Sequence, residues 1–295
     1  MKLAVAVAGV GAPDSAFVVW RGFEKSLEKA AECGYDGVEL ALKEAEEINL
    51  PGFRKNLDAH GLEVSCISTG QVFAVSGLCF THPDPELRSR TVDVFEGLVD
   101  LAAELASGSG GLINVGRARG SYCQERSAEE TEGLFIETAR KICDYAAPKN
   151  VTLMIEPVNR YEINFINSVP QAAELLTRVG RENIGIMPDV FHMNIEDVTI
   201  GGTLAEYAKQ IPYVHLADSN RYYPGAGHLD FADVFDAFER SRYDGWVSVE
   251  ILPYPDPDTA AKKAAATLRP LVDRHNYNRH NYTRALQEAP NARSQ

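Results

Sequence analysis

Short apolar runs alternate along the chain with longer segments in which apolar residues recur every three or four positions. The first pattern is typical of strands that are buried on both faces, and the second of helices with one apolar face. The apolar runs predict eight strands, over residues 3–9, 37–42, 63–69, 110–116, 151–156, 184–189, 213–218 and 246–251. The periodic segments predict eight helices, over residues 23–35, 48–61, 84–106, 127–147, 169–179, 202–210, 231–243 and 258–275.

Eight strands that each lead into a helix indicate an α/β protein of the (β/α)8 TIM-barrel class. The chain has 295 residues, enough for such a barrel, which typically takes about 250. No linker-like composition divides it, so we expect one barrel domain over 1–275 and a polar C-terminal tail over 276–295. Lys2 and the apolar run after it resemble a signal peptide, but the run is short and serves better as the first strand.

Net charge, the length of the apolar runs and the cysteine count limit the classes of partner and the compartment that we expect. The net charge of −13 opposes a surface that neutralises phosphates, so we expect no nucleic-acid partner. No apolar run approaches the roughly 20 residues that a membrane helix needs, so we expect no membrane partner. Five cysteines, an odd number without a CxxC pair, predict free thiols in a reducing cytoplasm.

Ionisable residues stand at the ends of four consecutive predicted strands. The fifth ends at Glu156, the sixth at Asp189 with His192 just after, the seventh carries His215, and the eighth ends at Glu250. A single ionisable residue at a strand end is more often a cap. Four such residues on neighbouring strands would meet at the carboxyl rim of a barrel, where active sites lie. Three carboxylates there repel one another unless a cation lies among them. With one imidazole they suit Mn²⁺, Mg²⁺ or Co²⁺, with zinc as an alternative.

Four segments in order carry a resemblance to a known family: "IEPVNRYE" (155–162), "PDVFHMNIED" (188–197), "HLADSNRYYPGAGHLDF" (215–231) and "VSVEI" (247–251). They resemble the ketose 3-epimerases, such as D-tagatose and D-psicose 3-epimerase, of the xylose isomerase-like barrel superfamily. The resemblance implies a small-molecule ketose or keto-sugar acid as substrate, one divalent metal ion, best Mn²⁺, and a homodimer or homotetramer.

The resemblance also implies roles for individual residues. Glu156, Asp189, His215 and Glu250 would bind the metal, and Glu156 and Glu250 would also be the catalytic acid–base pair. The two glutamates would exchange protons with a carbon next to the ketone, through a metal-bound cis-enediolate. The remaining implied residues bind substrate: His192 and Arg221 near its carbonyl and hydroxyl oxygens, with Glu162 supporting Glu156 or His192.

Some features depart from the free-ketose pattern. Asp218 and the pair His228 and Asp230 make the segment after His215 resemble the branch that acts on keto-sugar acids, such as 5-keto-L-gluconate epimerase. Arg117 and Arg119 follow the fourth strand. Most surface arginines are only solvated, but one of these, which we assign as Arg117, could clamp a carboxylate or phosphate.

Other functions share this barrel. An aldose–ketose isomerase of the hydroxypyruvate type, or a 3-keto-glycoside lyase, would use the same metal site. An endonuclease IV-like enzyme would need histidines at the ends of the second and third strands, which this sequence lacks. A carbohydrate-binding barrel without activity would have lost a carboxylate. The loop over 71–77 after the third strand is expected to wall the sugar pocket or simply to pack against the barrel.

Overall fold

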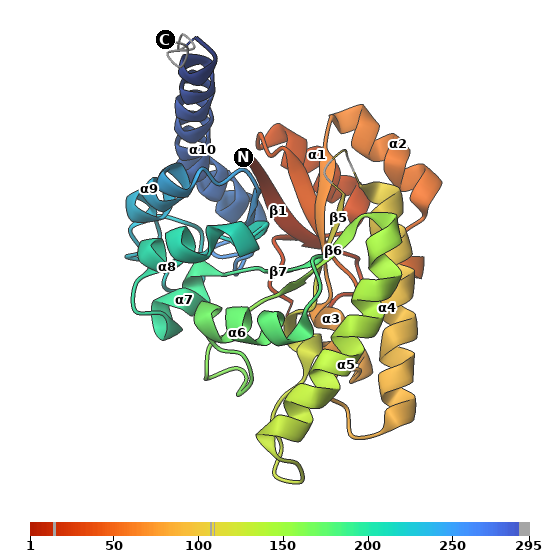
Figure 1. The fold of residues 1–295 in the computed structure, drawn as a ribbon. Helices are drawn as coiled ribbons and strands as arrows, with labels where there is room; N and C mark the ends of the chain where they lie inside the picture. Colours follow the sequence, from red (N-terminus) through yellow and green to blue (C-terminus); the bar gives the residue numbers. More distant parts are fainter. Residues whose placement is uncertain (14–15, 107, 109, 289–295) are drawn as a thin grey trace.

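The computed structural model describes residues 1–288 apart from 14, 15, 107 and 109, with no side chain described beyond residue 282. Eight parallel strands form a ring that helices surround, which confirms the predicted barrel (Figure 1). The barrel strands are β1 (Lys2–Ala8), β3 (Gly37–Ala41), β4 (Glu63–Ser68), β5 (Gly111–Asn114), β6 (Val151–Ile155), β7 (Ile184–Ile186), β8 (Tyr213–His215) and β9 (Trp246–Val249). A two-residue strand, β2 (Trp20–Arg21), pairs with the end of β1.

The strand order β7-β6-β5-β4-β3-β1-β9-β8 leaves one joint to close, between β7 and β8. That joint is an isolated parallel bridge between Asp189 and His215, in which the His215 amide donates to the Pro188 carbonyl at 2.8 Å. The barrel is therefore completed at its carboxyl rim by residues that the sequence places in the candidate site.

The helices form the outer layer of the barrel (Figure 1). They are α1 (Phe23–Glu32), α2 (Leu50–His60), α3 (Gly70–Ser76), α4 (Pro85–Leu105), α5 (Ala128–Ala146), α6 (Val169–Val179), α7 (Val190–Glu196), α8 (Ile200–Tyr207), α9 (Phe231–Ser241) and α10 (Pro257–Glu288). Local sequence explains several boundaries. Ser127 and Glu130 form a capping box at the start of α5, and Gly61 ends α2 in the left-handed conformation.

Alternation along β1 shows how the sequence divides inside from outside. Leu3, Val5 and Val7 belong to the large apolar cluster that includes the surrounding helices. Ala4 belongs instead to a small cluster drawn from six different strands or strand ends, which meet inside the ring: Ala4, Cys66, Met154, Met187, Tyr213 and Trp246. Ala6, the next inward residue, lines the pocket above them. Small inward side chains on β1 therefore leave room for the site.

The structure differs from the sequence prediction in three places. The segment expected as a loop over 71–77 forms α3, and residues after Asp189 form α7. Neither helix was predicted, because both are short and lack a long apolar repeat. The last helix runs to Glu288, so most of the polar tail expected from 276 onward is helical. Residues 289–295 of that tail lie outside the described residues. Figure 1 shows the end of α10 projecting away from the barrel.

None of the α-helices in the described part of the chain is both long enough and apolar enough to cross a membrane.

Candidate active site

Four strand ends bring their ionisable side chains to one point on the rim. Glu156 follows β6, Asp189 begins α7 just beyond β7, His215 ends β8, and Glu250 follows β9. Each offers one ligand atom, and these atoms all lie within 4.8 Å of one another. All four predicted metal ligands therefore converge, as the strand-end pattern anticipated.

Two atoms in this group show that it fits a cation. The Asp189 Oδ2 atom and the His215 Nδ1 atom are buried and have no hydrogen-bond partner among the described residues. His215 Nδ1 lies 3.4 Å from Glu156 Oε1 and 3.7 Å from Glu250 Oε2. Buried polar atoms without partners are costly, and a divalent ion bound by three carboxylates and an imidazole would satisfy them.

Glu39, which sequence reasoning missed, explains why His215 presents this nitrogen. Glu39 lies on β3, is fully buried, and its two carboxylate oxygens lie 2.9 and 3.0 Å from His215 Nε2. The Tyr213 hydroxyl donates to Glu39 at 2.9 Å, and the Ser68 hydroxyl donates to it as well. A carboxylate that accepts a hydrogen bond from the Nε2–H group fixes the orientation of the ring and leaves Nδ1 free as a ligand atom. The only sequence signal was an acid inside the apolar run "GVELAL".

Burial and neighbouring charges shift the pKa values of the residues in this group. Burial disfavours the charged imidazolium, but Glu39 and Glu250 raise the pKa of His215 well above its ordinary value. Burial also raises the pKa of Glu250 to about 8, against the opposing charges of His215 and Arg221. Although burial alone would raise it, the charge of His215, 3.4 Å away, and the hydrogen bond from Asn114 lower the pKa of Glu156 to about 2. Two carboxylates of opposite protonation at neutral pH suit general acid–base chemistry.

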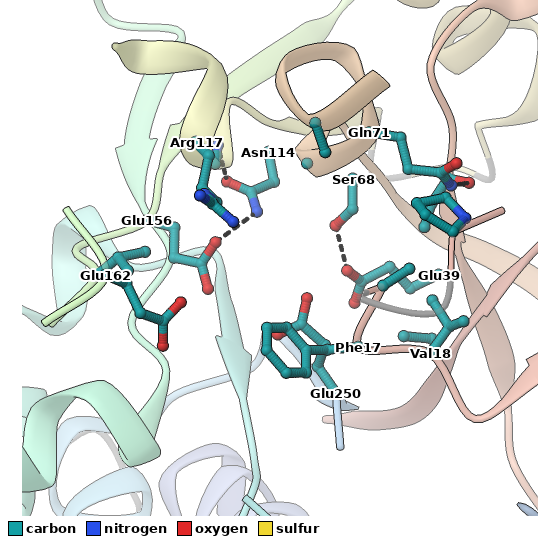
Figure 2. Close-up of a pocket in the computed structure, with 18 of the residues that line it drawn as sticks. Phe17, Val18, Glu39, Ser68, Gln71, Asn114, Arg117, Glu156, Glu162 and Glu250 are labelled. Atoms are coloured by element: carbon teal, nitrogen blue, oxygen red, sulfur yellow. Dashed lines mark hydrogen bonds between the residues drawn. The ribbon is translucent and has the colours of Figure 1, made fainter. Parts of the chain in front are cut away.

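Asn114 at the end of β5 contributes to this difference. Its side-chain amide donates to Glu156 Oε2 at 3.0 Å, while its own oxygen accepts from the Gly116 amide at 2.9 Å (Figure 2). An amide donor favours the ionised carboxylate. Asn114 thus holds Glu156 in place and charged, and nothing in its sequence context distinguished it from a strand-end cap.

Arg221 connects the predicted substrate-binding residues to the ligand set. Its guanidinium donates to Glu250 at 2.5 Å, and it lies 3.4 Å from Asp189 and 3.5 Å from Glu162. It also lies 3.1 Å from His192 Nε2. Arg221 is a non-glycine residue with a positive φ of 60°, an uncommon backbone conformation that carries strain.

Asp218 supports that strained position. Its carboxylate accepts from the backbone amides of Ser219 at 2.7 Å, Gly225 at 2.7 Å and Leu229 at 3.1 Å. Its carbonyl accepts from the Arg221 amide at 2.8 Å. Despite burial, these amides lower the pKa of Asp218. Asp218 therefore folds the loop after β8 that aims Arg221 at the site.

His192 is buried between Arg221 and Asn159. Its Nδ1 atom lies 2.7 Å from the Asn159 side-chain amide, which also donates to Glu162 at 3.0 Å. Burial, with the charge of Arg221, lowers the pKa of His192 well below its ordinary value, so the ring is neutral. Glu162 thus reaches His192 through Asn159. Asn159 and the Phe17 ring, 3.9 Å below the Arg221 guanidinium, were not anticipated from sequence.

A pocket opens above the ligand set. Glu39, Glu156, Glu162, His192, Arg221 and Glu250 line it together with Arg117 and small apolar residues. Figure 2 shows Glu156, Glu162 and Arg117 on one side of this space, with Glu39, Ser68 and Gln71 across from them. Six of the eight residues predicted for the site therefore line one cavity. The other two, Asp189 and His215, place their ligand atoms within 4.8 Å of those of Glu156 and Glu250. Part of the pocket wall comes from α3, in the segment that was expected as a loop.

The Xylose isomerase-like TIM barrel family matches residues 27–271. A ketose 3-epimerase of Arthrobacter globiformis is 32% identical over 230 residues, which cover 78% of this chain and 77% of the relative. An L-ribulose 3-epimerase of Mesorhizobium japonicum is 29% identical, covering 84% and 82% of the two chains.

A solved structure agrees with these sequence matches. The D-allulose 3-epimerase from Methylomonas sp. superimposes with a TM-score of 0.77 at 23% identity, over 92% of this chain and 98% of that one. At this identity the likeness supports the fold, and the sequence matches carry the family. The chain belongs to the xylose isomerase-like TIM-barrel family, and within it to the ketose 3-epimerases, which are enzymes of the isomerase class.

Proposed function

We propose that this protein is a divalent-metal-dependent epimerase that inverts a carbon next to the ketone of a ketose or keto-sugar acid. One observation carries the proposal: Glu156, Asp189, His215 and Glu250 converge within 4.8 Å and leave two buried ligand atoms without partners. The relatives that are named ketose 3-epimerases support the same reaction class.

These four residues would hold one divalent ion, for which we propose Mn²⁺, with Co²⁺ or Mg²⁺ as substitutes. When bound, such an ion would polarise the ketone and offset the negative charge that develops when the neighbouring carbon loses its proton. The donor set, three carboxylates and one imidazole, is hard and rich in oxygen, and it lacks the thiolates that structural zinc prefers.

The residues of the chain would move the proton. Glu156, whose pKa is lowered to about 2, is ionised and suited to remove a proton from one face of the carbon. In the ion-free chain burial raises the pKa of Glu250 to about 8, so this carboxylate takes up a proton more readily than Glu156 and is suited to carry the one returned to the other face. The two glutamates follow β6 and β9, with two strands between them, so they approach the substrate from different sides. Each transfer contributes about 10²–10⁴-fold.

Arg221 and His192 would hold the substrate oxygens beside this pair. The Arg221 guanidinium is fixed by Glu250 and Glu162 and stacked on Phe17, so its orientation is set before substrate arrives. His192 is neutral, so its ring can exchange a hydrogen bond with a hydroxyl without adding charge.

The experiment is NMR in D₂O with Mn²⁺-loaded protein and a panel of ketoses. Deuterium should enter at one carbon next to the ketone, together with the epimeric ketose. Glu156→Gln and Glu250→Gln should each slow this exchange by about 10³-fold or more. Glu28→Gln, at an exposed position on α1, is the matched control and should leave it unchanged.

The same spectra separate the alternatives. An aldose product would indicate the hydroxypyruvate-type isomerase reaction, and loss of an aglycone from a 3-keto-glycoside would indicate the lyase. Near-normal exchange by either glutamine variant while it still binds the ion would contradict the two-glutamate scheme.

A further inference from the structure

Two arginines, Arg117 and Arg119, follow β5 within one 3₁₀ turn, Gly116–Arg119. They differ in burial and in hydrogen bonding. Arg119 is fully buried and donates to the carbonyls of Glu156 at 2.7 Å, Phe165 at 2.8 Å and Gly116 at 2.9 Å. Arg117 is exposed and lines the pocket. Its guanidinium makes no hydrogen bond or ion pair with the described residues. Arg119 therefore anchors the turn, and Arg117 is free to bind something else.

The other cation of the pocket is already engaged. Arg221 donates to Glu250 and lies within 3.5 Å of both Asp189 and Glu162. Glu162, the carboxylate that lines the mouth together with Arg117, accepts from Asn159 and is paired with Arg221. Among the described pocket residues, Arg117 is thus the guanidinium whose five donors lack a partner.

The position of Arg117 is set by its surroundings. Its guanidinium lies over the Phe73 ring of α3, 5.6 Å from the ring centre. The turn is held by Arg119 and closed by Gly120, whose φ of 87° and close approach to Thr81 admit no side chain. Figure 2 shows Arg117 among the side chains that line the pocket. A donor group presented from a fixed turn loses little freedom when it binds a ligand.

We propose that the pocket selects a ketose whose end remote from the ketone carries a carboxylate, and that Arg117 binds this carboxylate. The inference rests on the proposed function, because the reacting end is placed by the four-ligand group. A guanidinium pairs bidentately with a carboxylate through its planar fork. The remaining pocket charges are mainly acidic, so Arg117 is where an anionic group finds attraction.

The test compares substrates that differ only at the sixth carbon. Mn²⁺-loaded protein is assayed with D-fructose and D-tagatose, with the matching C6 carboxylates D-fructuronate and D-tagaturonate, and with D-fructose 6-phosphate. We expect kcat/KM for a carboxylate substrate to exceed that for its neutral counterpart by about 30-fold or more. The phosphate should fall below the carboxylate.

The Arg117→Met variant keeps the length of the side chain without its charge. It should lose most of the preference for the carboxylate substrate, mainly through a higher KM, and its kcat/KM should fall far more for the carboxylate substrate than for the neutral ketose. Arg117→Lys should recover only part of the preference, because an ammonium cannot pair bidentately. Arg240→Met, at an exposed site on α9, is the control and should behave as the parent protein.

The outcomes separate this inference from the proposed function. Equal kcat/KM for neutral and carboxylate ketoses, a preference for the phosphate, or equal losses on both substrates in Arg117→Met would overturn the inference and leave the epimerase proposal intact. Absence of exchange with every ketose would instead overturn the proposed function itself.

Discussion

The two sides of the barrel are joined in different ways. Around β1 the ladder is regular: five residue pairs join β1 to β3, and four join β1 to β9. Between β7 and β8 the described residues form the single bridge from Asp189 to His215. The side with regular ladders is held by backbone hydrogen bonds and apolar packing, whereas the β7–β8 joint ends in charged groups.

The ligand set is divided evenly by that joint. Glu156 and Asp189 follow β6 and β7 on one side, and His215 and Glu250 belong to β8 and β9 on the other. The buried carboxylates of Glu156 and Asp189 and the partly buried one of Glu250 face one another across it, with His215 and Arg221 as the protein's own counter-charges. An ion bound by all four would therefore also hold the two sides of the joint together, so the active site and the closure of the barrel depend on the same residues.

The largest expected effect concerns this joint. Binding of Mn²⁺ should slow hydrogen exchange in peptides that cover 187–190 and 213–217, by up to about 100-fold when the ion is at about 100 times its Kd. Peptides from β1 and β3 should change far less. Hydrogen–deuterium exchange with mass spectrometry measures both, and Asp189→Asn is the variant that should lose the effect. Equal protection of both regions would show that the comparison is wrong.

A smaller effect is expected at Glu39, which reaches the joint from the regular side of the barrel. Glu39→Gln keeps the shape but removes the negative charge beside His215 Nε2, so Mn²⁺ should bind about 10–100-fold more weakly by isothermal titration calorimetry. Tyr213→Phe removes one hydrogen bond to Glu39 and should cost less than Glu39→Gln. Thermal melting confirms that each variant is folded. An unchanged Kd for Glu39→Gln would mean that the negative charge of Glu39 does not contribute to ion binding.

The smallest expected effect is the pH dependence of ion binding. Burial raises the pKa of Glu250 to about 8, and below that pH its carboxyl carries a proton that the ion must displace. The pKa of His215 is raised as well, so its proton must also be displaced. Affinity for Mn²⁺ should therefore fall by about tenfold or more for each pH unit below 8. Titrations from pH 6 to pH 9 measure this slope. A Kd that does not change over this range would show that neither Glu250 nor His215 carries a proton that the ion displaces.

The same contrast explains how much could be predicted from the sequence. The strand-end rule located Glu156, Asp189, His215 and Glu250 because parallel strands deliver their carboxyl ends to one rim. Glu39 escaped because its partner His215 comes from a distant strand. Asn114 escaped because a single polar residue at the end of an apolar run does not reveal that it faces Glu156 on the neighbouring strand. Both roles depend on which side chains meet inside the barrel, and that follows from strand register.

Helix prediction failed for a related reason. The helices α3 and α7 have seven residues each, too short for an apolar repeat to stand out. Their positions are set by the pocket that they cover and by local capping, as when the Asp189 carboxylate accepts from the Phe191 amide at 2.9 Å. In α10 the polar residues after 275 continue an established helix, because propagation needs no new nucleus.

The most direct test is the number of divalent ions that the protein binds. We predict one Mn²⁺ per chain for the parent protein by calorimetry and elemental analysis, with at least a hundredfold weaker binding for Asp189→Asn, where an uncharged amide replaces a ligand carboxylate. A parent protein that binds no ion, or an Asp189→Asn variant that binds one with unchanged affinity, would contradict the account that these carboxylates share a cation.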